Sequence, residues 1–398
     1  MNSQTIPVHI RLWHHEFWLL VIADLLLTMS VYMLIPTFPQ WLMADQGLTP
    51  EQTGLSMAAF ALGLYLFGPS CSWLVQQYRR NMVCLWAILA LAINVLLLGY
   101  FSPQTSFPRA LVHRMALGAA FGLAQMVLAS TLIIDTCESH QRTEANFGAA
   151  WFSRFALSLG PLAGLALAML PQNDYLSALE CQFSQITPIL LVSGIMAIVS
   201  LLLIFRVSFP FRTPEEGVSI VSLDRFFLPS GFLLFFNLLL ISIAVGLVLT
   251  LSLTMVFYAL MMVGFLLALL AQRFVFSNAE LKSEVLSGLI LLLASQFVLF
   301  VYPNSPVAPL LLGLAVGIIC SRFLLFFVKL SRHCQRGTSQ STYFLSWETG
   351  LALGLGIGYG VFTGDRSMLF YTCFALTAVA LAMYHFLTHS WFLKHKNR

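Results

Sequence analysis

The chain has 398 residues, of which 59% are hydrophobic and only 9% are charged, and its formal net charge at pH 7 is +4. A soluble domain carries about 25% charged residues, so this composition excludes a soluble globular protein and indicates an integral membrane protein in a lipid bilayer. The basic residues stand singly or in short groups between apolar segments, and we therefore expect no nucleic-acid partner.

Twelve apolar segments are long enough to cross a membrane, for which about 20 residues are needed. In chain order they cover residues 17–39, 52–76, 82–101, 109–135, 145–171, 184–208, 226–249, 251–275, 283–302, 308–331, 341–362 and 368–391. The weakest boundary is the seventh, where only TLSLT (250–254) separates two segments. The predicted fold class is an all-α integral membrane protein with twelve transmembrane helices.

Basic residues fall mainly on one side of the predicted membrane. If the N-terminus is cytoplasmic, 15 of the 20 Lys and Arg residues lie in cytoplasmic tails and loops, against two, Arg109 and Arg366, in outer loops. This bias is the positive-inside pattern, so both termini are predicted to be cytoplasmic.

The sequence contains an internal repeat at a shift of about 195 residues. The matching segments are Gly68–Tyr78 with Gly264–Phe274, Leu117–Gly122 with Leu312–Gly317, and Gln141–Gly164 with Gln335–Gly358. The repeat predicts two pseudo-symmetric six-helix halves, residues 1–209 and 226–398, joined by a central cytoplasmic loop at 210–225. Halves related by an axis along the membrane normal hold their substrate between them near the midplane.

The third alignment places Arg154 opposite Glu348. Each residue lies twelve positions after a Gln-Arg pair at the cytoplasmic end of its helix. A rise of about 1.5 Å per residue puts both roughly 15–18 Å deep, near the centre of the membrane.

Several motifs resemble those of the major facilitator superfamily over essentially the whole chain. The segment SWLVQQYRRN (72–81) is similar to the family's loop between helices two and three, with Ser72 in the place of a glycine and Gln76 in that of an aspartate. Arg80 remains basic and could pair with Asp135. Arg114 and Gly118 match the family's motif in the fourth helix.

The fifth helix carries the segment GPLAG (160–164), which is similar to a motif of drug/proton antiporters. The resemblance implies a bacterial inner-membrane transporter for a small molecule, coupled to H+ and working as a monomer. It implies neither a cofactor nor a catalytic or metal site.

Charged residues inside membrane segments are costly, and they are therefore candidates for function. The candidates for proton coupling are Asp24, Glu348 and Arg114, and those for substrate binding are Arg154, Arg322, Gln125, Asn237, Tyr32 and Trp347. The candidates for gating and packing are Gly160, Pro161, Gly164, Gly354, Gly358, Arg80 and Asp135. For the charged residues the alternative is static pairing that only compensates opposite charges.

The hypothesis that these patterns favour is a secondary transporter that exports a small amphipathic or drug-like molecule by alternating access. Proton-coupled uptake of a sugar, nucleoside or organic anion is the alternative, and an anion would suit Arg154 and Arg322. A membrane enzyme is a remote third possibility, with RLWHHE (11–16) as its one polar cluster. No P-loop motif indicates ATP as the energy source.

Overall fold

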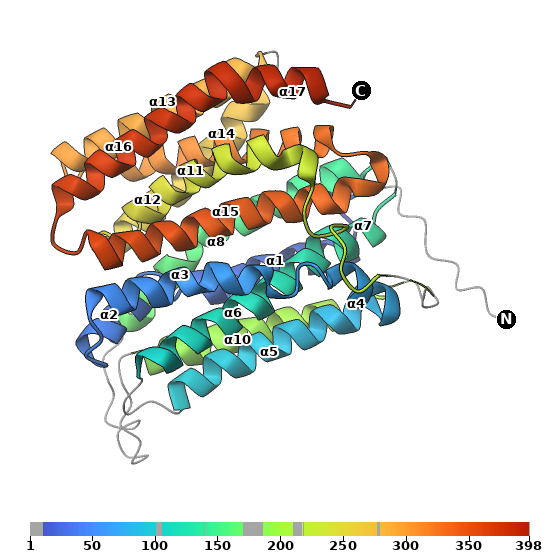
Figure 1. The fold of residues 1–398 in the computed structure, drawn as a ribbon, viewed down its shortest axis with the longest axis horizontal. Helices are drawn as coiled ribbons and strands as arrows, with labels where there is room; N and C mark the ends of the chain where they lie inside the picture. Colours follow the sequence, from blue (N-terminus) through green and yellow to red (C-terminus); the bar gives the residue numbers. More distant parts are fainter. Residues whose placement is uncertain are drawn as a thin grey trace.

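The computed structural model describes residues 11–100, 106–138, 140–169, 186–209, 217, 219–276 and 279–397. Within these ranges the chain forms helices joined by short turns and contains no strand. Figure 1 shows the long helices running side by side along the molecule's length. Helices α4 and α2 lie at opposite ends of the bundle, which are therefore called the α4 end and the α2 end.

The first group of helices is formed by residues before 210. Its members are α1 (His15–Tyr32), α2 (Phe38–Ala44), α3 (Pro50–Leu66), α4 (Cys71–Gln77), α5 (Arg80–Tyr100), α6 (Phe107–Val127), α7 (Ile133–Asp135), α8 (Arg142–Ala168) and α10 (Thr187–Phe205). A π-helical turn at Leu128–Leu132 joins α6 to α7.

The second group follows the central connection. It consists of α11 (Phe232–Val248), α12 (Met255–Phe274), α13 (Leu281–Val301), α14 (Val307–Leu330), α15 (Arg336–Val361), α16 (Arg366–Met383) and α17 (His389–His395). The boundary predicted at TLSLT is present, since Thr254 caps α12 by accepting a hydrogen bond from the backbone N–H of Phe257 at 3.3 Å. A side-chain cap of this kind satisfies an otherwise unpaired N–H group at the start of a helix.

Ten helices of the described residues are long and apolar enough to cross a membrane. An eleventh span is obtained if α3 and α4, which meet at a bend of 50°, are taken together. The remaining predicted span corresponds to α15, which is 26 residues long but rich in Ser, Thr and Gly. It is buried between α3 and α11 and needs little lipid-facing surface, so it can be less apolar than its neighbours.

Helix contacts follow the same pattern in both groups. In the first group the main contacts are α3 with α6, α5 with α6, α5 with α10, α1 with α8 and α1 with α10. In the second they are α12 with α14, α13 with α14, α13 with α16, α11 with α15 and α11 with α16. Each pair in the first group has its counterpart in the second, as duplication of a six-helix unit would require.

Glycines allow the closest of these contacts at equivalent places. A Cβ added to Gly63 on α3 would lie 2.1 Å from the carbonyl oxygen of Met115 on α6. A Cβ added to Gly264 on α12 would lie 2.4 Å from the carbonyl oxygen of Leu310 on α14. The backbones of both helix pairs therefore touch, as small residues permit in membrane helices.

The two groups meet through α3 with α15 and through α8 with α12 and α14. At the α2 end of the bundle, a Cβ on Gly54 would lie 2.4 Å from the carbonyl oxygen of Gly356. At the α4 end, a Cβ on Gly337 would lie 2.6 Å from that of Ser130. Contacts between the groups thus reach from one end of the interface to the other.

Candidate functional site

Asp24 on α1 is buried within the first helix group, with 3% of its surface exposed. Its carboxylate accepts hydrogen bonds from Gln125 Nε2 at 2.7 Å and from Ser153 Oγ at 2.5 Å. Gln125 also donates to Thr28 Oγ1 at 2.9 Å. Among the described residues, no cationic side chain lies within ion-pair distance of Asp24, so this carboxyl group is surrounded by neutral donors only.

Glu348 on α15 is equally buried, with 3% of its surface exposed. Its carboxylate accepts a short hydrogen bond from the hydroxyl of Tyr32 on α1, in the opposite helix group. Trp347 lies beside the same hydroxyl. At the next position on α15, the hydroxyl of Thr349 lies 2.9 Å from the hydroxyl of Tyr65 on α3. Glu348 therefore belongs to a set of polar contacts that joins the two groups near their centre.

Arg154 lies near the middle of α8 and reaches toward the second helix group. Its Nη1 donates to the hydroxyl of Ser321 on α14 at 2.6 Å, and its guanidinium carbon lies 4.7 Å from the centre of the Trp151 ring. The structure does not bring Arg154 to Glu348, because the carboxylate of Glu348 is bonded to Tyr32 instead. The two residues that align in the repeat each contact a hydroxyl group across the interface.

Arg322 is paired within its own group. Its Nε forms a short ion pair with Glu284 on α13, whose surface is 1% exposed. For Arg322, this ion pair favours the static pairing that was the alternative to substrate binding. Glu284 was missing from the set of intramembrane charges, although it falls at the second position of the segment predicted at 283–302.

Asn237 and Arg114 also lie away from the contacts between the groups. Asn237 on α11 donates to the carbonyl oxygen of Ala380 at 3.1 Å and to Thr388 at 3.4 Å, so it joins α11 to α16 and the turn that follows. Arg114 on α6 is packed between the rings of Phe38 and Phe60, with its guanidinium carbon 5.4 and 5.1 Å from their centres. Both are buried inside their own helix group.

The predicted packing glycines bring helices of one group together. A Cβ on Gly160 would lie 2.9 Å from the Cβ of Tyr32, and one on Gly164 would lie 2.3 Å from the carbonyl oxygen of Met33. Gly354 and Gly358 contact α11 and Thr250 in the same way, with the nearest atoms at 2.3 and 2.5 Å. Pro161 is buried inside α8. These residues fix α8 against α1, and α15 against α11.

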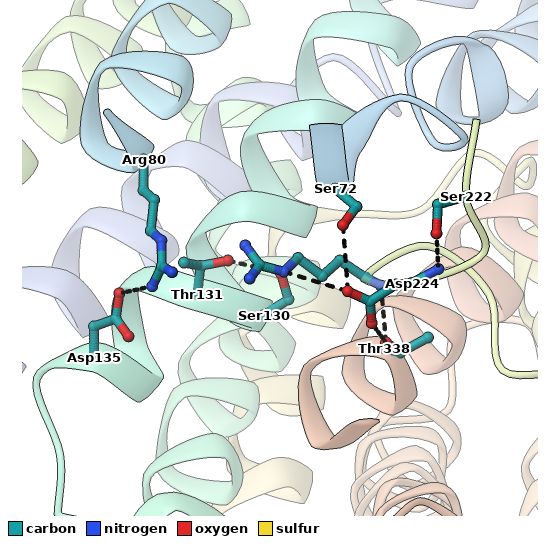
Figure 2. A network of polar contacts seen from close by, with 9 residues as sticks. Ser72, Arg80, Ser130, Thr131, Asp135, Ser222, Asp224 and Thr338 are labelled. Carbon is teal, nitrogen blue, oxygen red and sulfur yellow. Dashed lines mark hydrogen bonds and ion pairs between the residues drawn. The ribbon is translucent and has the colours of Figure 1, made fainter. Parts of the chain in front are cut away.

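At the α4 end, a polar network links the two groups through the central connection (Figure 2). Asp224 accepts hydrogen bonds from Ser72 on α4 at 3.3 Å and from Thr338 on α15 at 3.1 Å. Ser72 is the residue that replaces a glycine of the family motif, so this departure provides a donor. Asp224 and Thr338 were not predicted, because a hydrogen bond between a loop residue and a helix residue 114 positions apart leaves no signal in the sequence.

The expected pair Arg80–Asp135 lies on the same side of the bundle, with Nη1 and Oδ2 2.6 Å apart (Figure 2). It joins α5 to α7 within the first group. The nearby Arg225 is largely buried, and its burial together with the positive charge of Arg80 lowers the pKa of the Arg225 guanidinium below its usual value.

The fold and these buried polar groups define a polytopic helical membrane protein with two equivalent helix groups. The sequence matches the family model described as the Major Facilitator Superfamily over residues 20–355. This match covers most of the chain, and the chain belongs to that family. Family members are transporters rather than enzymes and bind small-molecule substrates, and their fold implies twelve membrane crossings.

Solved structures of other family members have the same fold. A bacterial homologue of the human lysosomal transporter Spinster, in an inward-facing unoccupied conformation, is 16% identical, with a TM-score of 0.69 and coverage of 96% of this chain and 98% of its own. The human organic anion transporter MFSD10 is 16% identical, with a TM-score of 0.64 and coverage of 92% and 98%. The fucose:proton symporter of E. coli is 13% identical, with a TM-score of 0.64 and coverage of 96% and 98%.

Identities this low establish the shared fold alone. A search of curated proteins found no relative with a significantly similar sequence.

Proposed function

We propose that this protein is a proton-coupled secondary transporter that works by alternating access, with Asp24 and Glu348 as its proton-binding groups. The observation that carries the proposal is the surroundings of these two carboxyl groups. Both are buried at the centre of a membrane protein and are bonded to neutral donors only. A charged carboxylate is costly in such a place, so it can take up a proton in one conformation and release it in another.

The carboxyl groups of Asp24 and Glu348 would serve different parts of the transport cycle. Asp24 is bonded to α6 and α8, within one helix group. Glu348 is bonded across the interface to Tyr32, so a change in its protonation would change a contact that must break when the groups separate. This arrangement supports coupling of proton movement to the rocking of one group against the other.

We propose that the protein exports an amphipathic molecule across the cytoplasmic membrane of a bacterium. The α4 end of the bundle would face the cytoplasm. The supporting features are the Gly160–Pro161 motif in α8, which resembles that of drug/proton antiporters, and the excess of Lys and Arg toward the α4 end. The same geometry also supports uptake, and the level of the substrate in expressing cells distinguishes the two directions.

The test is an untargeted comparison of metabolites and drugs in cells with and without the protein, each with and without an uncoupler of the proton gradient. We expect at least one small molecule to be depleted in expressing cells, and this depletion to disappear with the uncoupler. Accumulation in place of depletion would show uptake. Depletion that persists when the proton gradient is collapsed would contradict proton coupling.

The variants Asp24→Asn and Glu348→Gln test the two residues. We expect each to abolish gradient-driven movement of the identified substrate in proteoliposomes while its binding persists. Asp365→Asn is the matched control, because Asp365 is an exposed carboxylate that caps α16 at the α2 end. Normal gradient-driven transport by both variants would show that these residues are not the coupling groups.

A further inference from the structure

Arg154 has hydrogen-bonding capacity that the protein does not use. Only 5% of its surface is exposed, and its Nη1 donates to the hydroxyl of Ser321 at 2.6 Å. Within the described residues, Nε and Nη2 are buried and have no acceptor within hydrogen-bond distance. No carboxylate in the described part of the chain lies within ion-pair distance of this guanidinium. A buried cation without an anion is costly, which points to a partner from outside the chain.

The N–H groups at Nε and Nη2 of Arg154 have the geometry needed to bind a carboxylate. Nε and Nη2 form one edge of the planar guanidinium, and their parallel N–H bonds match the two oxygens of a carboxylate. The hydroxyl of Ser321 accepts a hydrogen bond from Nη1 of Arg154, and it donates to the carbonyl oxygen of Gly317 at 2.8 Å. The hydroxyl of Tyr343 on α15 also lies close to Arg154. The unoccupied edge is therefore held in a fixed orientation.

Aromatic side chains lie around the guanidinium of Arg154. The Trp151 ring stacks beside the guanidinium, and Phe155 lies 5.9 Å from Trp151 and 6.4 Å from Phe265 on α12, measured between ring centres. Trp151 also lies against Gly317, at 3.3 Å from the position of a Cβ there. A molecule bound to Arg154 would place the rest of its body among apolar rings, which would favour an apolar or aromatic skeleton.

The site lies between the two helix groups. Arg154 belongs to α8, while Ser321, Phe265 and Tyr343 belong to α14, α12 and α15. Separation of the groups would open it. The residue before Arg154, Ser153, donates to Asp24 at 2.5 Å, so one helix contacts both the anion site and the proposed proton site.

We propose that Arg154 binds the anionic group of the substrate, and that the substrate is a small organic monoanion whose carboxylate accepts hydrogen bonds from Nε and Nη2. The inference rests on the proposed transport function and names its substrate class. One guanidinium neutralises one negative charge, which favours a carboxylate over a doubly charged phosphate.

The test measures ligand binding to the purified full-length protein without any proton gradient. The probes are benzoate, 4-phenylbutyrate and octanoate, each compared with its neutral primary amide, and the measurement is the shift in unfolding midpoint with ligand concentration. We expect at least one acid to raise the midpoint and its amide to have no effect. Equal shifts by acid and amide, no shift by any acid, or the same shift with sodium chloride alone would overturn the proposal.

Three variants locate the effect. Arg154→Gln should remove the acid-dependent shift. Arg154→Lys keeps the positive charge but cannot donate two parallel hydrogen bonds to a carboxylate, so it should weaken the apparent affinity about 10- to 100-fold. Ser158→Ala is the matched control, because Ser158 lies one turn further along α8 and donates across the same interface to the carbonyl oxygen of Tyr258 at 2.5 Å. It should bind the acid like the wild type. Unchanged binding by the lysine variant would overturn the proposal even if the glutamine variant failed to fold.

Failure of this inference is distinguishable from failure of the proposed function. Loss of proton coupling in Asp24→Asn with intact acid binding would support both proposals together. Gradient-driven transport of a neutral molecule, with no acid binding, would leave the transport function in place and contradict only the assignment to Arg154.

Discussion

Helices α8 and α15 occupy equivalent places in the two helix groups, and they carry opposite charges at equivalent positions. Each packs through glycines against the first helix of its own group, α1 or α11. Arg154 on α8 and Glu348 on α15 both reach into the other group. In the part of the chain that the structure describes, neither meets an opposite charge there, since Arg154 contacts the Ser321 hydroxyl and Glu348 the Tyr32 hydroxyl.

Buried charges in this protein are either paired within one helix group or directed across the interface between the groups. Arg80–Asp135 joins α5 to α7, which continues α6 after the π-helical turn, and Glu284–Arg322 joins α13 to α14, so both pairs are compensated inside one group. The charges that cross the interface have neutral partners instead. A hydrogen bond to a neutral hydroxyl costs less free energy to break than an ion pair does. Charges that cross the interface can therefore exchange this partner for a proton or a substrate when the interface moves.

The largest effect should come from filling the close contacts that α8 and α15 share. A Cβ on Gly164 would lie 2.3 Å from the carbonyl oxygen of Met33, and one on Gly354 would lie 2.3 Å from that of Ile243. We expect Gly164→Ala and Gly354→Ala each to remove most of the folded protein, because rigid backbones cannot yield that far. Recovery of monodisperse protein by size-exclusion chromatography measures this.

The control for the glycine variants is Gly360→Ala on α15, whose nearest atom would be 3.5 Å from the new Cβ, an ordinary contact. It should be recovered like the wild type. If only one of the two close-contact variants lost folded protein, α8 and α15 would not be equivalent in packing.

The next effect concerns charge pairs within a group. Glu284→Gln should destabilise the protein by about 3 kcal/mol, because it leaves Arg322 without its anion. Arg154→Gln should cost about 1 kcal/mol at most, since the one hydrogen bond that it removes is offset by relief of a buried cation that has no anion. Unfolding midpoints in denaturant measure both. The double variant Glu284→Gln/Arg322→Gln should be more stable than Glu284→Gln alone, and equal destabilisation by Glu284→Gln and Arg154→Gln would remove the distinction between compensated and crossing charges.

A smaller effect should come from the two hydroxyl partners. Tyr32→Phe should destabilise the observed conformation by about 2 kcal/mol, because it leaves the Glu348 carboxyl group buried without a donor. Ser321→Ala should cost about 1 kcal/mol, since Arg154 keeps its contact with the Trp151 ring. The same unfolding measurement compares them. The reverse order would indicate that Arg154 depends on its partner more than Glu348 does.

The smallest effect concerns two cysteines that precede α8 and α15. Burial raises the pKa of Cys137 to about 11, whereas Cys334 is exposed. Only the thiolate reacts, so Cys137 should be alkylated by a maleimide very slowly at pH 7, with a rate that rises about tenfold per pH unit toward pH 10. Variants with one of the two as the sole cysteine provide the comparison. A rate at Cys137 that is independent of pH would show that access, and not ionisation, limits it.

Much of the fold was predictable because it depends on properties that are local in sequence. Apolar segments of about 20 residues gave most helix positions to within a few residues, as the tenth span shows with 308–331 predicted and α14 at Val307–Leu330. The pair Arg80–Asp135 was expected because the motif resemblance placed both residues at the same end of the bundle. The segment at 341–362 was also predicted as a span, although α15 is less apolar than its neighbours and is not among the ten helices that are long and apolar enough to cross a membrane.

The partners of the buried charges were not predictable in the same way. The repeat aligned Arg154 with Glu348 and so placed them at one depth, but alignment along the membrane normal says nothing about the direction of a side chain. Glu284, Ser153 and Ser321 became important only through helix rotation, which brings each within hydrogen-bond distance of a charge on another helix.

The sequence by itself determined the membrane-protein class, most of the spans, the duplication and the family, because hydrophobic length and motif spacing are one-dimensional quantities. Only the tertiary structure decided which charges are paired and which cross the interface. That outcome depends on the rotation of each helix about its axis and on contacts a few ångströms long between residues as far apart as Tyr32 and Glu348.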